Sequence, residues 1–154
     1  GVGGGAGGPL VVPGTYQVRL TMGDWSQSRA VEVKIDPRVA DAGVTQADLD
    51  EQLDLSLKVR DASAEARALT GALGQARERY KADAARSKAL QTLWARVVTA
   101  PIVYPQPMLI DQFSNIARMI GQADQKPGKD AWDRYNDLMK ELAAIKAELA
   151  RLGV

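Results

Sequence analysis

Residues 11–38 read VVPGTYQVRLTMGDWSQSRAVEVKIDPR, and they are the part of the chain whose pattern is typical of β-structure. Apolar side chains occupy alternate positions of the first half: Tyr16, Val18, Leu20 and Met22. This alternation gives a strand one apolar and one polar face. Gly23 and Asp24 offer a tight turn, because glycine tolerates a positive φ. The stretch therefore predicts a β-hairpin with strands at 15–22 and 25–35.

The returning strand has a less regular pattern than the first. Its inward positions are expected to be Val31, Val33 and Ile35. Trp25 does not join this face smoothly, because weakly patterned residues 28–30 lie between, and a β-bulge is predicted there. The pair Asp36-Pro37 is expected to end the strand.

The sequence PGTY at the start of the hairpin suggests a particular sheet. In immunoglobulin-like sandwiches, a tyrosine at the corner before the penultimate strand bonds to backbone a few residues upstream. Pro13 and Gly14 would make that corner, and Tyr16 would supply the hydroxyl. The hairpin would then be the last two strands of a sandwich. The alternative is an ordinary hairpin with a buried tyrosine. A lone hairpin is only marginally stable, so in either case it must pack on something.

Beyond Pro37, alanine, leucine and charged residues dominate and follow a helical period. Helices are predicted at 46–80, 84–99, 108–123 and 129–152, and three prolines make 99–107 a loop. Thr45 is the expected cap of the first helix. Its core stripe is expected to contain Leu49, Leu53, Leu57, Ala64, Ala68, Leu69, Ala72 and Leu73. The expected stripes of the later helices run through Leu90, Leu93, Trp94 and Val97, then Leu109, Phe113, Ile116 and Ile120, and finally Trp132, Tyr135, Leu138, Met139, Leu142, Ile145, Leu149 and Leu152.

The predicted fold is thus α+β but mainly α. It comprises a partial immunoglobulin-like β-hairpin at 10–37 and an antiparallel three- or four-helix bundle at 45–152. The glycine-rich residues 1–9 are expected to form a flexible linker. They lack the basic and apolar regions of a signal peptide.

Composition excludes several classes of site. The 154 residues carry a formal charge of +1, from 20 basic and 19 acidic side chains. That balance gives no electrostatic reason to expect a nucleic-acid partner, and no apolar run is long enough to predict membrane insertion. The chain has no cysteine and no histidine. Disulfides, thiolate sites and histidine-based catalysis are therefore excluded within it. No cofactor, metal or catalytic residue is predicted.

Two groups of residues stand out. The first is acidic and lies in the opening turns of the first helix: Asp48, Asp50, Glu51 and Asp54. Carboxylates there match the positive end of the helix dipole, which is favoured over a calcium site. The second group is apolar and lies in or next to the proline loop: Ile102, Val103, Tyr104 and Met108. It is a candidate interaction surface, although a plug over the bundle end is favoured.

The order of these parts resembles the C-terminal region of large bacterial proteins with sortilin-like, BNR-repeat or glycosyl-hydrolase-like β-propellers. In that family a PGTY-type strand, a glycine turn and a strand closing in Asp-Pro-Arg precede a helical domain. The matching residues here are 13–16, Gly23-Asp24, 36–38 and the helix start at Thr45. Asp24 departs from the second glycine usual in the turn.

The resemblance implies a non-catalytic structural or protein-interaction module of a larger exported protein, in the periplasm or outside the cell. Its expected partner is the upstream propeller and immunoglobulin-like part, or a second copy of the chain. Two alternatives stay open. One is a carbohydrate-active domain, which would need converging carboxylates and one perturbed acid. The other is a helical adaptor with an uncovered leucine stripe at 129–152.

Overall fold

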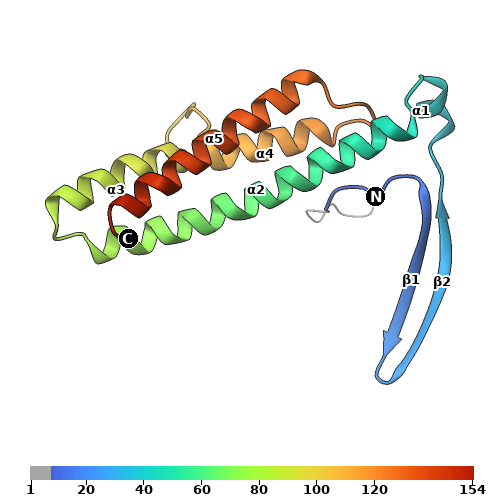
Figure 1. Ribbon diagram of the computed structural model, residues 1–154, viewed down its shortest axis with the longest axis horizontal. Coiled ribbons are helices and arrows are strands. Elements are labelled where there is room, and N and C mark those ends of the chain that lie inside the picture. The colour runs from blue at the N-terminus through green and yellow to red at the C-terminus, as the bar shows by residue number, and fades with distance from the viewer. Residues whose placement is uncertain (1–7) are drawn as a thin grey trace.

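Figure 1 shows the computed structural model of the chain, which describes residues 8–154. Its elements in order are β1 (Gly14–Met22), β2 (Trp25–Val33), α1 (Pro37–Asp41), α2 (Gln46–Arg79), α3 (Ala84–Val97), α4 (Leu109–Ile120) and α5 (Lys129–Arg151). The predicted fold class, a β-hairpin followed by a helical bundle, is confirmed. The linker predicted at 1–9 lies outside the described residues except for Gly8 and Pro9.

The hairpin pairs without interruption. β1 and β2 are antiparallel, and every position from the Gly14–Val33 pair to the Met22–Trp25 pair has a partner. Gly23 takes the positive φ of +58° that the turn requires. The predicted bulge at residues 28–30 is therefore wrong. Neither face of this sheet packs on the helices, so no inward face forces the register to shift.

A short helix that the sequence did not predict links the hairpin to the bundle. Asp36 caps α1 by accepting a 2.9 Å hydrogen bond from the backbone N–H of Arg38. Pro37 suits the first helical position, because it has no N–H to leave unpaired. The next helix, α2, begins with a capping box in which Thr45 and Asp48 bond to each other's backbone N–H groups. Local caps thus define both helix starts.

The cap of α1 gives a pH-dependent prediction. The Arg38 side chain hydrogen-bonds the Asp36 carboxylate and, with the backbone bond, lowers its pKa from 3.8 to about 2. Because the folded pKa is the lower one, this cap stabilises α1 fully above about pH 4 and is lost as the pH falls to about 2. We expect carboxyl-carbon NMR to show Asp36 titrating near 2. In Arg38→Met the value rises towards 3.8, and a titration unaffected by that change contradicts the assignment.

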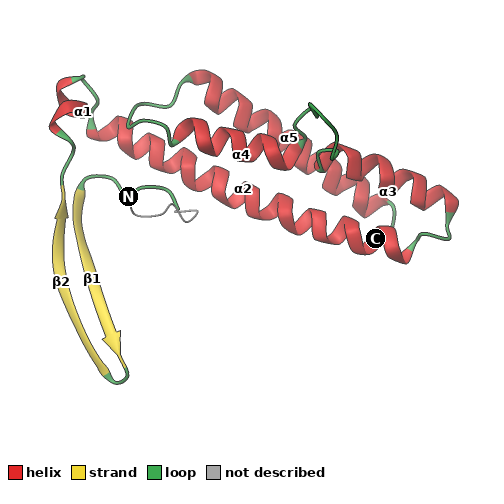
Figure 2. Cartoon of the chain, turned by 180° about the vertical axis from the view of Figure 1, so that it is seen from behind, coloured by secondary structure: helices red, strands yellow, loops and turns green. Residues whose placement is uncertain are grey.

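The four long helices form three rods. Helix α2 has 34 residues and runs for about 50 Å at 1.5 Å per residue. In both views α3 and α4 follow one another along α2 in the opposite direction, and α5 returns beside them (Figures 1 and 2). The predicted antiparallel bundle is confirmed, with the middle rod interrupted at residues 98–108. Helix α2 passes through Gly71 and Gly74 without a break.

The core agrees with the predicted stripes for three of the four helices. The buried side chains of α3, α4 and α5 include Leu90, Leu93, Val97, Leu109, Phe113, Ile116, Ile120, Leu138, Leu142, Ile145 and Leu149. On α2 the predicted stripe is partly wrong. The core positions are Leu49, Leu55, Val59, Ala62, Ala66, Leu69, Leu73 and Ala76, whereas Leu53 and Leu57 are half-buried and Ala64, Ala68 and Ala72 are exposed. Alanine and leucine surround much of α2, so periodicity alone does not select its inward face.

One side chain ties the α4–α5 turn to α2. The Gln52 amide nitrogen donates to the carbonyls of Ile120 at 2.6 Å and Ala123 at 2.7 Å. Its oxygen accepts from the backbone N–H of Gln125 at 3.4 Å. A single glutamine thereby satisfies the last carbonyl of α4 and one carbonyl in the turn that follows it.

We expect Gln52→Leu to lower the free energy of unfolding by about 1–2 kcal/mol, because carbonyls at the helix end lose their donor. The matched control is Gln46→Leu on the same helix, whose amide bonds only to the exposed Asp50. That control changes stability by less than about 0.5 kcal/mol. Urea unfolding measures both variants, and equal effects of the two contradict the role assigned to Gln52.

Candidate interaction surfaces

The hairpin carries an apolar face that no part of the described chain covers. Because directly paired residues share a face, its apolar members are Tyr16, Val18, Leu20, Met22, Trp25, Val31 and Val33, and the face also carries Gln27 opposite Leu20 and Arg29 opposite Val18. Leu20 is 65% exposed and Met22 is 75% exposed. The hairpin projects away from the helices, with its turn at the far end (Figures 1 and 2). An exposed surface with this many large apolar side chains is typical of a contact site.

The base of the hairpin has the geometry of a tyrosine corner. The hydroxyl of Tyr16 donates to the carbonyl of Val12, four residues upstream, at 2.6 Å. The ring lies over the start of the strand, since a β-carbon placed on Gly14 would be 3.7 Å from Cε2 of Tyr16. Pro13 precedes this contact and lies just before β1. Immunoglobulin-like sandwiches make a bond of this kind near the start of their penultimate strand.

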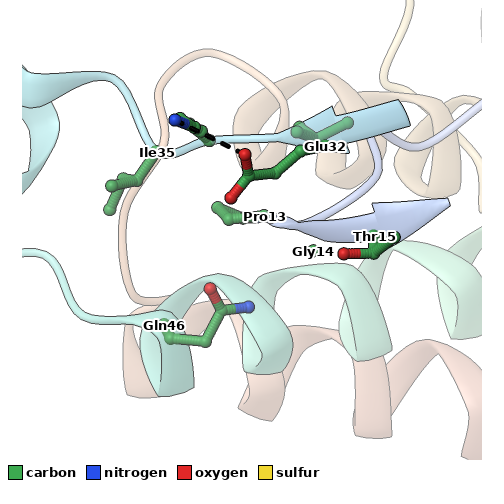
Figure 3. Close-up of a pocket in the computed structure, with 8 residues that line it drawn as sticks. Pro13, Gly14, Thr15, Glu32, Ile35 and Gln46 are labelled. Atoms are coloured by element: carbon green, nitrogen blue, oxygen red, sulfur yellow. Dashed lines mark ion pairs between the residues drawn. The ribbon is translucent and has the colours of Figure 1, made fainter. Parts of the chain in front are cut away.

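An open notch separates the hairpin from the bundle. It has a volume of about 490 Å³, and Pro13, Thr15, Glu32, Ile35 and Gln46 lie around it (Figure 3). Glu32 and Lys34 form an ion pair across one wall at 3.4 Å. The lining is mixed polar and apolar and largely open to water. The hairpin and the bundle are therefore connected through residues 34–45 but do not pack against each other across the notch.

The proline loop points outward, so the favoured prediction of a core plug is wrong. Ile102, Val103 and Tyr104 are 65%, 82% and 96% exposed, whereas Met108 is half-buried. The loop base is closed by a 2.9 Å bond from the N–H of Met108 to Oγ1 of Thr99. The physical reason is the arrangement of α3 and α4. They lie in line along the bundle, so the loop leaves its side and has no open end to cover (Figure 1).

The acidic group of α2 has several separate structural roles. Asp48 belongs to the capping box, and the Thr45 bonds lower its pKa. Glu51 accepts from the indole N–H of Trp132 at 2.9 Å. Asp50 accepts from Gln46, and Asp54 pairs with Lys58. Asp48 and Glu51 also both approach the ammonium of Lys126, at 3.9 Å and 3.6 Å, so the acidic side chains of this group are engaged by neighbouring protein groups.

The aspartates with a shifted pKa are helix caps. Besides Asp36 and Asp48 they include Asp83, whose pKa is lowered chiefly by the backbone N–H of Arg86 at the start of α3. A general acid for glycoside hydrolysis needs a raised pKa. Among residues 8–154, the carboxyl groups with a resolved shift are all lowered.

The leucine stripe of α5 faces the core rather than a partner. Leu138 and Leu142 are each 1% exposed, Ile145 is fully buried and Leu149 is 7% exposed. The uncovered stripe that a helical adaptor would need is therefore occupied by α2, α3 and α4. Within the described part of the chain, no helix has the length and apolar character needed to cross a bilayer.

The sequence did not indicate a hollow beside the proline loop. It lies where the loop meets α4 and is lined in part by Pro107, Gln112, Ile116, Met119 and Arg134. The sequence assigned Ile116 to the core stripe of its helix, and the polar residues of the lining belong to no sequence motif. The fixed arrangement of the loop against α4 and α5 creates this site, so sequence patterning carries no signal for it.

Comparisons of the chain with protein-family models, curated proteins and solved structures found no match.

Proposed function

We propose that this chain is a non-catalytic structural and protein-interaction module. Its hairpin forms the last two strands of an immunoglobulin-like sandwich, and its helical bundle is attached at the end of that sandwich. The remaining strands come from the upstream part of a larger exported protein with a sortilin-like β-propeller. The module then works in the periplasm or outside the cell.

The observation that carries the proposal is the bond from Tyr16 to the Val12 carbonyl, made at the base of an uncovered apolar sheet. Two strands with both edges open make a marginal structure in water. Pairing with further strands would satisfy the outer backbone groups and bury the apolar face against a second sheet. The propeller and the exported setting are supported by the sequence resemblance.

The opposite face of the hairpin fits the same arrangement. Its residues are mainly polar: Thr15, Gln17, Arg19, Thr21, Ser26, Ser28 and Glu32. A sandwich strand alternates an inward apolar residue with an outward polar one. Strand β1 therefore has the two-sided character of a strand in an outer layer, and Trp25, Val31 and Val33 of β2 extend its apolar face.

The test joins the chain to the segment that precedes Gly1 in its parent reading frame. We expect the amides of β1 and β2 to exchange at least about tenfold more slowly in the joined protein, because local opening becomes costlier. Fluorine NMR of fluorotryptophan-labelled protein gives a second readout, since Trp25 is 48% exposed in the chain alone. Its resonance should lose its sensitivity to solvent on joining.

A matched pair of variants controls for the face of the sheet. Leu20→Asp puts a charge on the apolar face and should abolish the protection, whereas Thr21→Asp, one residue on and on the opposite face, should preserve it. An upstream segment without sandwich strands, or unchanged exchange after joining, overturns the proposal.

A further inference from the structure

The two strands of the hairpin contribute different side chains to its apolar face. On β1 every side chain that points to this face is apolar: Tyr16, Val18, Leu20 and Met22. On β2 the apolar row is interrupted in the middle of the strand, where Gln27 lies opposite Leu20 and Arg29 lies opposite Val18. Both of these polar side chains are exposed in the chain. The two strands therefore need different surroundings once the face is covered.

The guanidinium of Arg29 restricts the surroundings that β2 can have. If a further strand lay beyond β2, a second sheet over the apolar face would enclose Arg29 on all sides, and burying an unpaired charge is strongly unfavourable. At the outer edge of the sheet, the long side chain can turn its charged end sideways into water. A charge that points inward is also one of the ways in which proteins protect a sheet edge from further pairing. The position of Arg29 therefore favours β2 as the last strand of the sheet.

The free edge of β1, on the side away from β2, has no such obstacle. The one charged residue of β1 is Arg19, and its guanidinium donates across the hairpin to Oγ of Ser26 on β2 at 3.0 Å. That bond directs the charge of Arg19 away from the free edge. The sheet has only the two strands, and no helix within residues 8–154 packs on β1. The free edge of β1 is therefore open to a further strand.

Both edges of the hairpin have backbone groups to offer. Met22 and Trp25 flank a two-residue turn, so they exchange backbone hydrogen bonds, and the pattern alternates along the strands. The backbone groups that point outward consequently belong to the residues of the polar face: Thr15, Gln17, Arg19 and Thr21 on β1, and Ser26, Ser28, Ala30 and Glu32 on β2. The two edges therefore differ in their side chains rather than in their backbone groups.

We propose that the upstream part of the protein adds a strand to the free edge of β1, and that β2 is the outer edge of the completed sheet. The inference rests on the proposed function, because it assumes the sandwich and names the edge that completes it. The added strand alternates polar and apolar residues and continues the apolar row of β1. In both views β1 lies on the side of the hairpin toward which the helices extend, so the sheet grows on that side (Figures 1 and 2).

Hydrogen exchange in the joined protein, which includes the upstream segment, tests the choice of edge. The outward amides of Gln17 and Arg19 should exchange at least about tenfold more slowly than in the chain alone, because they gain hydrogen bonds to the added strand. The outward amides of Ser28 and Ala30 should stay within about threefold of their rates in the chain alone. Within β2, the amides that slow on joining are those directed at β1, such as Val31. Slowing at Ser28 and Ala30 but not at Gln17 and Arg19 reverses the strand order and overturns the inference.

Proline substitutions in one pair of the ladder provide matched variants. Gln17 and Ala30 are directly paired, and both direct their N–H groups outward. Proline removes an N–H group and is accepted in a strand where that group faces solvent. In the joined protein, Gln17→Pro should reduce the protection of β1 at least about tenfold, whereas Ala30→Pro should preserve it to within about threefold. In the chain alone neither proline removes a hydrogen bond of the hairpin, so the two variants should exchange alike. Equal effects in the joined protein overturn the choice of β1.

The same measurements separate this inference from the proposed function. If joining slows no amide of the hairpin, the sandwich itself is wrong and both proposals fail. If joining slows Val31 and shields Trp25 from solvent while Gln17 and Arg19 still exchange fast, the apolar face is covered but β1 has gained no neighbour. In that case the sandwich stands and only the choice of edge is overturned.

Discussion

We expect Phe113→Ala to lower the free energy of unfolding by about 3–5 kcal/mol, the range for removing a buried phenylalanine. Phe113 has no exposed surface and is the largest of the fully buried side chains. It lies on α4, the second half of the interrupted rod, between α2 and α5. The neighbours are held in long helices and can close only part of the cavity that alanine would leave. Urea unfolding followed by circular dichroism measures the change.

Arg118→Ala is the matched control on the same helix. Arg118 is exposed in the last turn of α4, so its loss should change stability by less than about 0.5 kcal/mol. If Phe113→Ala costs no more than this control, α4 does not contribute to the core in the way described.

The second large effect is a difference in hydrogen exchange between the two parts of the chain. We expect amides in the centre of the bundle to be protected at least about a thousandfold more than those of the hairpin in the chain by itself. The cause is that bundle amides open only with most of the fold, whereas the hairpin has no packing against the helices. Paired Val18 and Arg29 in the sheet, and Leu142 and Ile145 in α5, are suitable reporters.

Equal protection of these four residues would mean that the hairpin docks on the bundle or pairs with another chain. Repeating the measurement at several protein concentrations separates these explanations, because only pairing between chains depends on concentration. Slow amide exchange in the hairpin at every protein concentration would mean that it docks on the bundle, and that result would contradict the open arrangement of the two parts.

The sequence predicted the elements well because the signals for them are local. The stripe of Leu109, Phe113, Ile116 and Ile120 repeats at helical spacing and occupies the core. Thr45 caps α2, and Gly23 adopts the turn conformation expected of it. Each of these features depends on residues no more than a few positions apart, or on one face of one helix.

The predictions that failed concern which faces of the helices, and which side of the proline loop, pack against the rest of the bundle. Ala64 and Ala68 were expected in the core of α2, but the partner helices pack against Ala62 and Ala66. Alanine can be buried equally well on either side of the helix, so only the positions of the neighbouring helices decide which alanines of α2 enter the core. Tyr104 was expected to help cover the bundle end, but α3 and α4 lie in line and the loop leaves the side. The arrangement of α3 and α4, rather than the composition of the loop, therefore determined how exposed Tyr104 is.

The sequence by itself determined the order of the hairpin and helices, their caps and most of the core, because alternation, helical period and capping act over short distances along the chain. Only the tertiary structure decided that the helices leave the face bearing Leu20 and Met22 uncovered, that Tyr104 projects, and that the Gln112 amide oxygen is buried without a hydrogen-bond partner among residues 8–154. Exposure and unmet hydrogen bonds depend on segments far apart in the sequence. They are therefore fixed when the rods pack against one another, after the local pattern has been satisfied.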